Sequence, residues 1–152
     1  MDINIFFSEL EKLLKQEGLE TYLMPGTEPQ IGDTLRAMVP VTESGEAVLL
    51  EVMAVPLTDD AHLLQIYSTV IPEIGSAYEA LKDALLDWNL TCLLGAYGIY
   101  KPLMQLYHKY NYLMPVEVPP EEMAEEIFYI IDLVRDVIAQ VLPEAVRLSK
   151  RA

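Results

Sequence analysis

Apolar residues recur at intervals of three and four in three segments of the chain, which is the spacing of one buried helix face. The first segment covers residues 3–17, and Gly18 follows it as a residue suited to a helix end. The second covers residues 76–88 and begins with Ser76-Ala77-Tyr78-Glu79, the pattern of a capping box. These positions predict two helices of about four turns each.

The third helical segment begins at Pro119-Pro120, followed by four glutamates that suit the positive end of a helix dipole. Pro143 is expected to end or kink this helix. Its predicted buried stripe consists of Met123, Ile127, Ile130, Val134, Val137 and Val141.

Five further segments have the composition of strands: residues 34–41, 47–57, 62–71, 91–100 and 103–114. The connections between the first three are short, as expected for antiparallel neighbours. The stretch from Val48 to Val55 is apolar at both alternating sets of positions except for Glu51. We therefore expect it in the sheet interior with both faces at least partly covered.

Residues 19–33 contain Pro25, Gly26, Pro29 and Gly32 and are predicted to form a loop, with a short extended piece at Thr21 to Met24. The predicted order is therefore α-β-β-β-α-β-β-α. Strands that follow one another without a helical crossover form an antiparallel sheet, so the fold class is α+β, with about five strands and three helices. A length of 152 residues fits one domain, residues 1–152.

Charge narrows the choice of partners. Ten Lys and Arg face 24 Asp and Glu, a formal net charge of −14. Such a surface repels nucleic-acid phosphates and anionic lipid, so neither nucleic acid nor membrane is an expected partner. A single cysteine, no signal-peptide pattern and no apolar run of 18 residues predict a cytoplasmic protein.

Local phrases in the second half of the chain are similar to those of a known family. They are Trp88-Asn89-Leu90, then Leu94-Gly95-Ala96-Tyr97-Gly98-Ile99, a long strand through Tyr107, and Leu142-Pro143-Glu144 after an acidic helix start. With this element order, the chain resembles the YbjN-type family of bacterial sensory transduction regulators, whose domain looks like the type III secretion chaperone fold. The Lys101-Pro102 turn departs from the polar turn more usual there. The resemblance implies a non-enzymatic, cytoplasmic, dimeric domain of unknown function and names no substrate.

Candidate reactive residues are few: His62, His108 and Cys92 match no zinc or nucleophile spacing. Cys92 lies in an apolar run and is interpreted as a small buried hydrophobe. His62 is expected in solvent at a strand start, and His108 half-buried on a strand. We therefore predict no catalytic residues, no metal ligands and no cofactor.

The carboxylate pairs Asp59-Asp60, Glu121-Glu122 and Glu125-Glu126 are interpreted as solvated surface rather than as an acid/base or metal site. Gly95 and Gly98 form a Gly-x-x-Gly within a strand, with no Lys-Ser/Thr and no helix after it. This pattern indicates a bulge or a close backbone approach instead of a phosphate loop.

Tyrosines are concentrated in the last two predicted strands. Tyr97 is expected to face opposite to Tyr100, whereas Tyr110 and Tyr112 share a face with His108. They fit ordinary cross-strand packing, or a contact surface of rings with wet hydroxyls. The candidate partner-binding residues are Tyr100, Tyr107, Tyr110 and Tyr112.

These observations lead to a non-enzymatic module that binds a protein or peptide, in a chaperone-like or regulatory role. An extended basic segment added to a sheet edge is one expected binding mode. A small-molecule sensor that holds a ligand between sheet and helices is the alternative, and an undetected hydrolase is a third. Because apolar residues occupy both faces of the second strand, we also expect a homodimer.

Overall fold

The structure is a computed structural model that describes residues 1–26 and 32–150. Three α-helices and six strands follow one another in the order α-β-β-β-β-α-β-β-α, with a short 3-10 helix before the second α-helix. The elements are α1 (Ile3–Gln16), β1 (Thr21–Met24), β2 (Thr34–Pro40), β3 (Ala47–Thr58), β4 (Ala61–Ile71), η1 (Gly75–Ala77), α2 (Tyr78–Thr91), β5 (Ala96–Tyr100), β6 (Gln105–Pro115) and α3 (Pro120–Lys150).

The six strands form one antiparallel sheet in the order β1-β2-β3-β4-β6-β5. The predicted α+β class and antiparallel sheet are therefore confirmed. The short extended piece is a sixth strand, β1, which pairs Thr21 with Ala37 of β2. Part of the predicted loop around it, including Pro29, lies outside the described residues.

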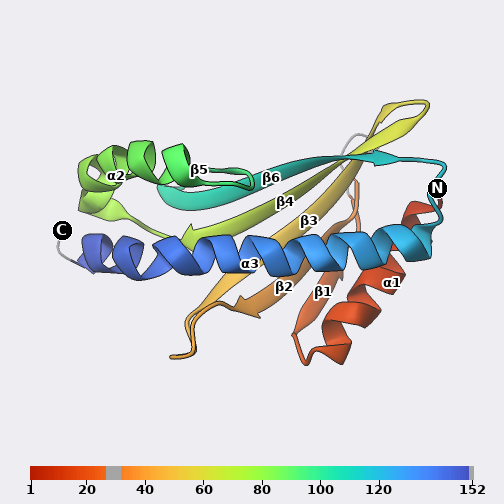
Figure 1. Ribbon diagram of the computed structural model, residues 1–152, viewed down its shortest axis with the longest axis horizontal. Coiled ribbons are helices and arrows are strands. Elements are labelled where there is room, and N and C mark those ends of the chain that lie inside the picture. The colour runs from red at the N-terminus through yellow and green to blue at the C-terminus, as the bar shows by residue number, and fades with distance from the viewer. Residues whose placement is uncertain (27–31, 151–152) are drawn as a thin grey trace.

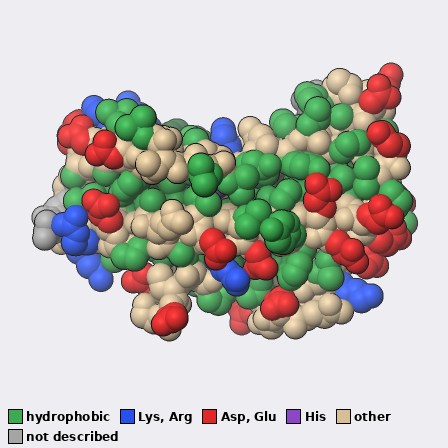
Figure 2. All heavy atoms as spheres, viewed as in Figure 1, with side chains coloured by type: hydrophobic (Ala, Val, Ile, Leu, Met, Phe, Trp, Pro, Cys, Tyr) green, Lys and Arg blue, Asp and Glu red, His purple; other side chains and the backbone are tan. Residues whose placement is uncertain are grey.

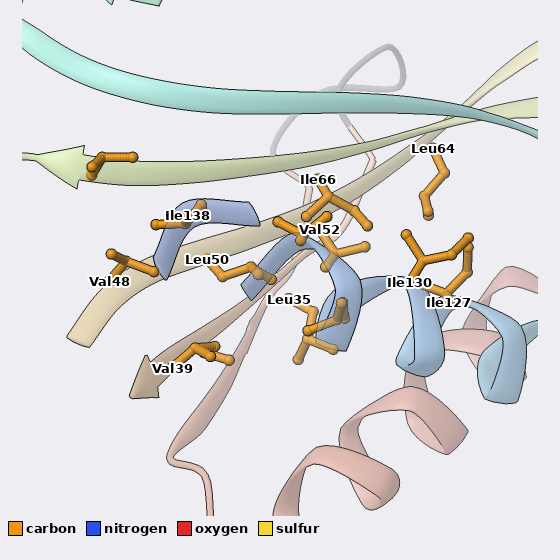
Figure 3. Packing of buried hydrophobic residues seen from close by; sticks show 14 of the residues in the cluster. Leu35, Val39, Val48, Leu50, Val52, Leu64, Ile66, Ile127, Ile130 and Ile138 are labelled. Carbon is orange, nitrogen blue, oxygen red and sulfur yellow. The ribbon is translucent and has the colours of Figure 1, made fainter. Parts of the chain in front are cut away.

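The helices lie on one side of the sheet (Figure 1). Helix α3 crosses in front of the strands along the long axis of the molecule, α1 packs beside its first half, and α2 lies next to β5. Alternate strand residues face these helices because side chains of a strand point to opposite faces. In β3 they are Val48, Leu50 and Val52, all at most 2% exposed and packed near Ile130 and Ile138 of α3 (Figure 3).

The other face of β3 is less covered than the face toward the helices. β3 does lie in the sheet interior, between β2 and β4. Its Leu49 and Met53 point away from the helices and are only half-buried, as is Glu51 between them. Both faces were expected to be at least partly covered, and the half-buried side chains on this face agree with that, but the described helices cover the other face only. The opposite side is called the open face below.

Helix α2 begins and ends later than predicted. The capping box at Ser76 and Glu79 is wrong, because the chain enters the helix through η1 and Ala77, the N-cap, makes no side-chain capping bond. The helix continues to Thr91, so β5 begins at Ala96 rather than at residue 91. Gly95, with φ +73°, reverses the chain direction between them.

Helix α3 passes through Pro143 and continues to Lys150, so of the two outcomes expected at this proline, an end or a kink, the end is wrong. Five of the six residues predicted for its buried stripe are buried. The exception is Val137, which is half-buried, while its neighbour Ile138 is fully buried. Helix α1 ends as predicted: the amide of Gly18 donates to Lys15 and that of Leu19 to Leu14, the two bonds of a Schellman motif.

Within residues 1–26 and 32–150, no helix is both long enough and apolar enough to cross a membrane.

Candidate functional site

A hollow of about 790 Å³ lies on the open face of the sheet. Residues that alternate with the core positions on β2, β3 and β4 line it, and the β5–β6 turn closes one side. Most of the lining is apolar. The apolar members are Met38, Ala47, Leu49, Met53, Val70, Pro72, Tyr100 and Leu103, and the polar ones are Arg36, Glu51, Gln65, Tyr67, Thr69 and Gln105.

Charge is nearly absent from this face. Of the residues in the six strands, only Arg36, Glu51 and Lys109 carry a charge. Arg36 and Glu51 are register partners on β2 and β3, and the Arg36 Nε lies 3.0 Å from the Glu51 carboxylate. The two half-exposed charges cancel locally, although such a pair adds little stability. Apart from Glu51, the acidic residues of the described segments lie in the helices and connections, as Figure 2 shows for the helix-bearing side near the start of α3.

One wall of the hollow is the ring of Tyr67, which is stacked on Tyr107. The Tyr67 ring on β4 lies 5.1 Å from that of Tyr107 on β6, and its hydroxyl donates a 3.3 Å hydrogen bond to Gln105. Burial, with smaller contributions from Tyr107 and Glu51, raises the pKa of Tyr67 to about 12. Its hydroxyl therefore remains a hydrogen-bond donor at neutral pH.

Gly98 makes room for this wall. A Cβ at position 98 would lie 2.4 Å from the Tyr107 hydroxyl and 2.5 Å from its Cζ. A side chain there would displace the Tyr107 ring from Tyr67. The interpretation of the two glycines as points of close approach is confirmed, although Gly95 precedes the strand and only Gly98 lies in it.

The four candidate tyrosines divide between the two faces. Tyr100 is 46% exposed and lines the hollow, and Tyr107 packs against Tyr67 at its edge. Tyr110 and Tyr112 point to the helix side, where the Tyr112 hydroxyl donates a 2.7 Å hydrogen bond to Glu126 of α3. The alternation predicted for these residues is confirmed, but the structure does not bring all four together.

The sequence reasoning missed most of the hollow. Of the lining residues, the candidate set predicted from the sequence contains Tyr100 but not Leu49, Met53 or Tyr67. The available signal was alternation: positions 49, 51, 53 and 65, 67, 69 fall on one face once β3 and β4 are paired.

Cys92 and His108 lie close together but do not form a nucleophile and its base. The Sγ of Cys92 is 3.9 Å from the His108 Nε2, and both lie within hydrogen-bond distance of the Leu94 carbonyl, at 3.2 and 2.7 Å. A carbonyl only accepts, so Nε2 carries the proton and the lone pair of the ring is on Nδ1. The ring therefore offers no lone pair to the thiol. Cys92, predicted to be a small buried hydrophobe, is half-buried.

His108 is fully buried, where the sequence predicted half-burial. Its Nδ1 has no hydrogen-bond partner among the described residues, and neither has the Oγ of the equally buried Ser68, its register partner on β4. Burial lowers the pKa of His108, partly offset by the Leu94 carbonyl. The ring is therefore neutral at physiological pH.

His62 is half-buried and its Nδ1 is also buried without a partner in the described part of the chain, so the prediction of a solvated side chain is wrong. Its pKa is lowered by burial and then by the positive N-terminal amine. The carboxylates 59, 60, 121, 122, 125 and 126 are exposed, as predicted. Within the described ranges, no three His, Cys, Asp or Glu side chains gather closely enough to hold a metal ion.

Compared with known proteins, the chain matches no protein-family model, and no curated protein matches it significantly. The resemblance to the YbjN-type family and to type III secretion chaperones therefore stays a prediction.

Proposed function

We propose that this protein is a binding module for another polypeptide and that the hollow on the open face is its binding site. The observation that carries this proposal is the surface itself: a broad, apolar, nearly uncharged sheet face that no described helix covers. Large contiguous apolar patches are uncommon on monomers and usually mark interaction sites. The resemblance stated above, which implies a non-enzymatic regulatory or chaperone-like domain, points the same way.

The composition of the hollow suits a protein partner. Met38 and Met53 are flexible and adapt to different side chains, as methionines do at promiscuous binding surfaces. Tyr100 and Tyr67 add large rings with polar tips, the type of residue enriched at the centres of interfaces. Gln65 and Gln105 offer amide groups that orient a bound segment.

A small molecule in the same hollow is the second candidate function. Its volume of about 790 Å³ falls within the range of roughly 300–1,000 Å³ found for small-ligand pockets. The alternative site between sheet and helices is less suitable. Leu50, Val52, Ile66 and Ile138 fill that layer at no more than 1% exposure, so a ligand there would have to displace the core.

A photoreactive benzoylphenylalanine in place of Met53 tests the proposal in the cells that make the protein. The matched control carries the same residue at Leu86, which is 72% exposed on α2 and outside the hollow. We expect covalent attachment of another polypeptide from position 53 but not from position 86. Equal cross-linking from both positions, or none from position 53, would count against the proposal. A metabolite that raises the melting temperature and blocks the cross-link would favour the second candidate.

The expected homodimer stays a prediction alongside this proposal. Light scattering at micromolar concentration measures it directly. A mass of about 34 kDa, twice the 17.2 kDa of one chain, would support it, and 17 kDa independent of dilution would contradict it.

A further inference from the structure

We propose that the occupant of the hollow is an amphipathic α-helix of a partner protein, with basic residues flanking its apolar stripe. This inference rests on the proposed function and specifies the conformation and charge of the bound segment.

The backbone around the hollow favours a helix over an extended segment. The hollow lies over β3 and β4, and each of these strands is hydrogen-bonded on both sides, β3 to β2 and β4, and β4 to β3 and β6. Within the described residues, these two strands therefore offer no free edge to an added strand, and the free edge of β5 lies to one side of the hollow, beyond Tyr100. An extended peptide would thus place its own amide and carbonyl groups on an apolar surface, where unpaired groups cost free energy. A helix satisfies these groups internally and presents only side chains.

The size of the surface also fits. Five neighbouring strands, β2, β3, β4, β6 and β5, contribute to the hollow. At about 4.8 Å between strands, they span roughly 15 to 20 Å. That width corresponds to about three turns of helix at a pitch of 5.4 Å. A segment of three to four turns therefore covers the hollow, much as α3 covers the opposite face.

Charge decides which kind of helix fits. The strands carry two cations and one anion. The connections at the end of the sheet where the hollow lies carry three exposed acids, Glu43, Glu46 and Glu73, and one cation, Lys101. These connections therefore carry a net charge of −2 beside the apolar hollow, and we call them its acidic rim. A helix with Lys or Arg beside its apolar stripe complements both parts. A second copy of this chain would bring two acidic rims together, in molecules that each carry a net charge of −14.

A designed peptide provides the test. The probe is a fluorescently labelled 16-residue peptide with leucines at helix positions i, i+3, i+4 and i+7, Ala and Gln elsewhere, and two lysines at each end. One comparison peptide has two central Ala residues replaced by Pro, and another has Glu in place of every Lys. Binding to the full chain is measured by fluorescence anisotropy. We expect at least tenfold weaker binding of both comparison peptides, and affinity of the lysine peptide that falls with added salt.

Two leucine variants locate the binding. Leu49→Gln removes apolar surface from the hollow, and Leu86→Gln makes the same change on exposed α2 without altering net charge. Both variants are first shown to melt at the wild-type temperature within a few degrees. We expect Leu49→Gln to weaken binding of the lysine peptide about tenfold and Leu86→Gln to leave it unchanged, because only Leu49 is buried by the bound helix.

The outcomes separate this inference from the function on which it rests. Equal binding of the Pro peptide, equal binding of the Glu peptide, or equal loss in Leu86→Gln would overturn the helix proposal. So would a dimer that Leu49→Gln converts to monomer, since a second copy would then occupy the hollow. If the lysine peptide fails while Met53 still cross-links another polypeptide in cells, the binding function stands and the inference fails. If the lysine peptide does not bind and position 53 cross-links no polypeptide, the inference and the proposed function are both wrong.

Discussion

The hydroxyl of Tyr97 on β5 donates a 3.0 Å hydrogen bond to the backbone carbonyl of Val137 in the middle of α3. This bond joins an edge strand to the longest helix across 40 residues of sequence. Burial, and then the nearby Cys92, raises the pKa of Tyr97 above its ordinary value, so the phenol remains a donor. The Tyr97 backbone is held as well, because Asn89 of α2 bonds both its amide and its carbonyl, at 2.8 and 2.9 Å.

Tyr97→Phe is expected to lower the free energy of unfolding by about 1 kcal/mol, the usual net value of one hydrogen bond. The ring stays in place against Trp88 and His108, so the loss reports the hydroxyl alone. Urea unfolding measures it. The control is Tyr100→Phe, which removes a hydroxyl from an exposed ring and should change stability little. Equal effects of the two variants would show that the Val137 contact contributes nothing.

His108 predicts a loss of stability on mild acidification. Its pKa is lowered from 6.5 in the folded state, so below that pH the unfolded chain binds the proton first. The free energy of unfolding should therefore be unaffected by His108 above about pH 7. Below pH 6.5 it should fall by up to about 1.4 kcal/mol per pH unit. Unfolding is measured between pH 5 and 8.

The variant His108→Gln serves as control for this slope, since His62, whose pKa is also lowered, remains in it. We expect the variant to be less stable at pH 7.5 but less dependent on pH between 5 and 6.5. An unchanged slope would assign the pH dependence to other groups and refute the prediction.

Ser68→Ala is expected to stabilise the protein. The Ser68 hydroxyl is fully buried and makes no hydrogen bond to any described residue, so removing it relieves a desolvation cost without breaking a contact. We expect the free energy of unfolding to rise by up to about 1 kcal/mol. A decrease of that size would mean that the hydroxyl does have a partner, for which the unpaired Nδ1 of His108 across the strand pair is the candidate.

Two glycines predict unequal costs for the same substitution. A Cβ at Gly95 would lie 2.5 Å from the Lys109 backbone carbonyl, and the backbone there has φ +73°. At Gly98 the obstacle is the Tyr107 side chain, which can move. We expect Gly95→Ala to cost about 3 kcal/mol and Gly98→Ala about 1 kcal/mol, measured by thermal and urea unfolding.

A double variant checks the reason for this difference. Tyr107→Ser should relieve most of the cost of Gly98→Ala, since the clash is with the ring. Tyr107→Ser should not reduce the stability cost of Gly95→Ala. Additive effects in both pairs would contradict the steric explanation.

The sequence by itself determined the class of this fold and most of its elements. Periods of two and of three to four residues are local properties, because they follow from strand and helix geometry. They placed β2, β3 and β4 within one residue at either end and identified α1 and the buried stripe of α3. Local geometry also gave the faces of Tyr97, Tyr100, Tyr110 and Tyr112.

Tertiary contacts decided the elements and helix ends that these periods do not determine. Strand β1 has only four residues and exists because β2 offers it an edge. Helix α3 continues through Pro143, where packing of Leu142 and Ala145 against the core outweighs the lost backbone hydrogen bond. Helix α2 continues beyond its predicted end because Trp88 and Asn89 are fixed by contacts with Tyr97.

The candidate site depended most on tertiary structure. Alternation shows that Leu49, Met53 and Tyr67 point to the opposite sheet face from the residues next to them in the strand. It does not show on which of the two faces the helices pack. Only the assembled sheet puts all three helices on one face and leaves the other open. An apolar residue in a sequence does not show whether it belongs to the core or to a binding surface. The same hydrophobic effect drives burial within the chain and burial against a partner.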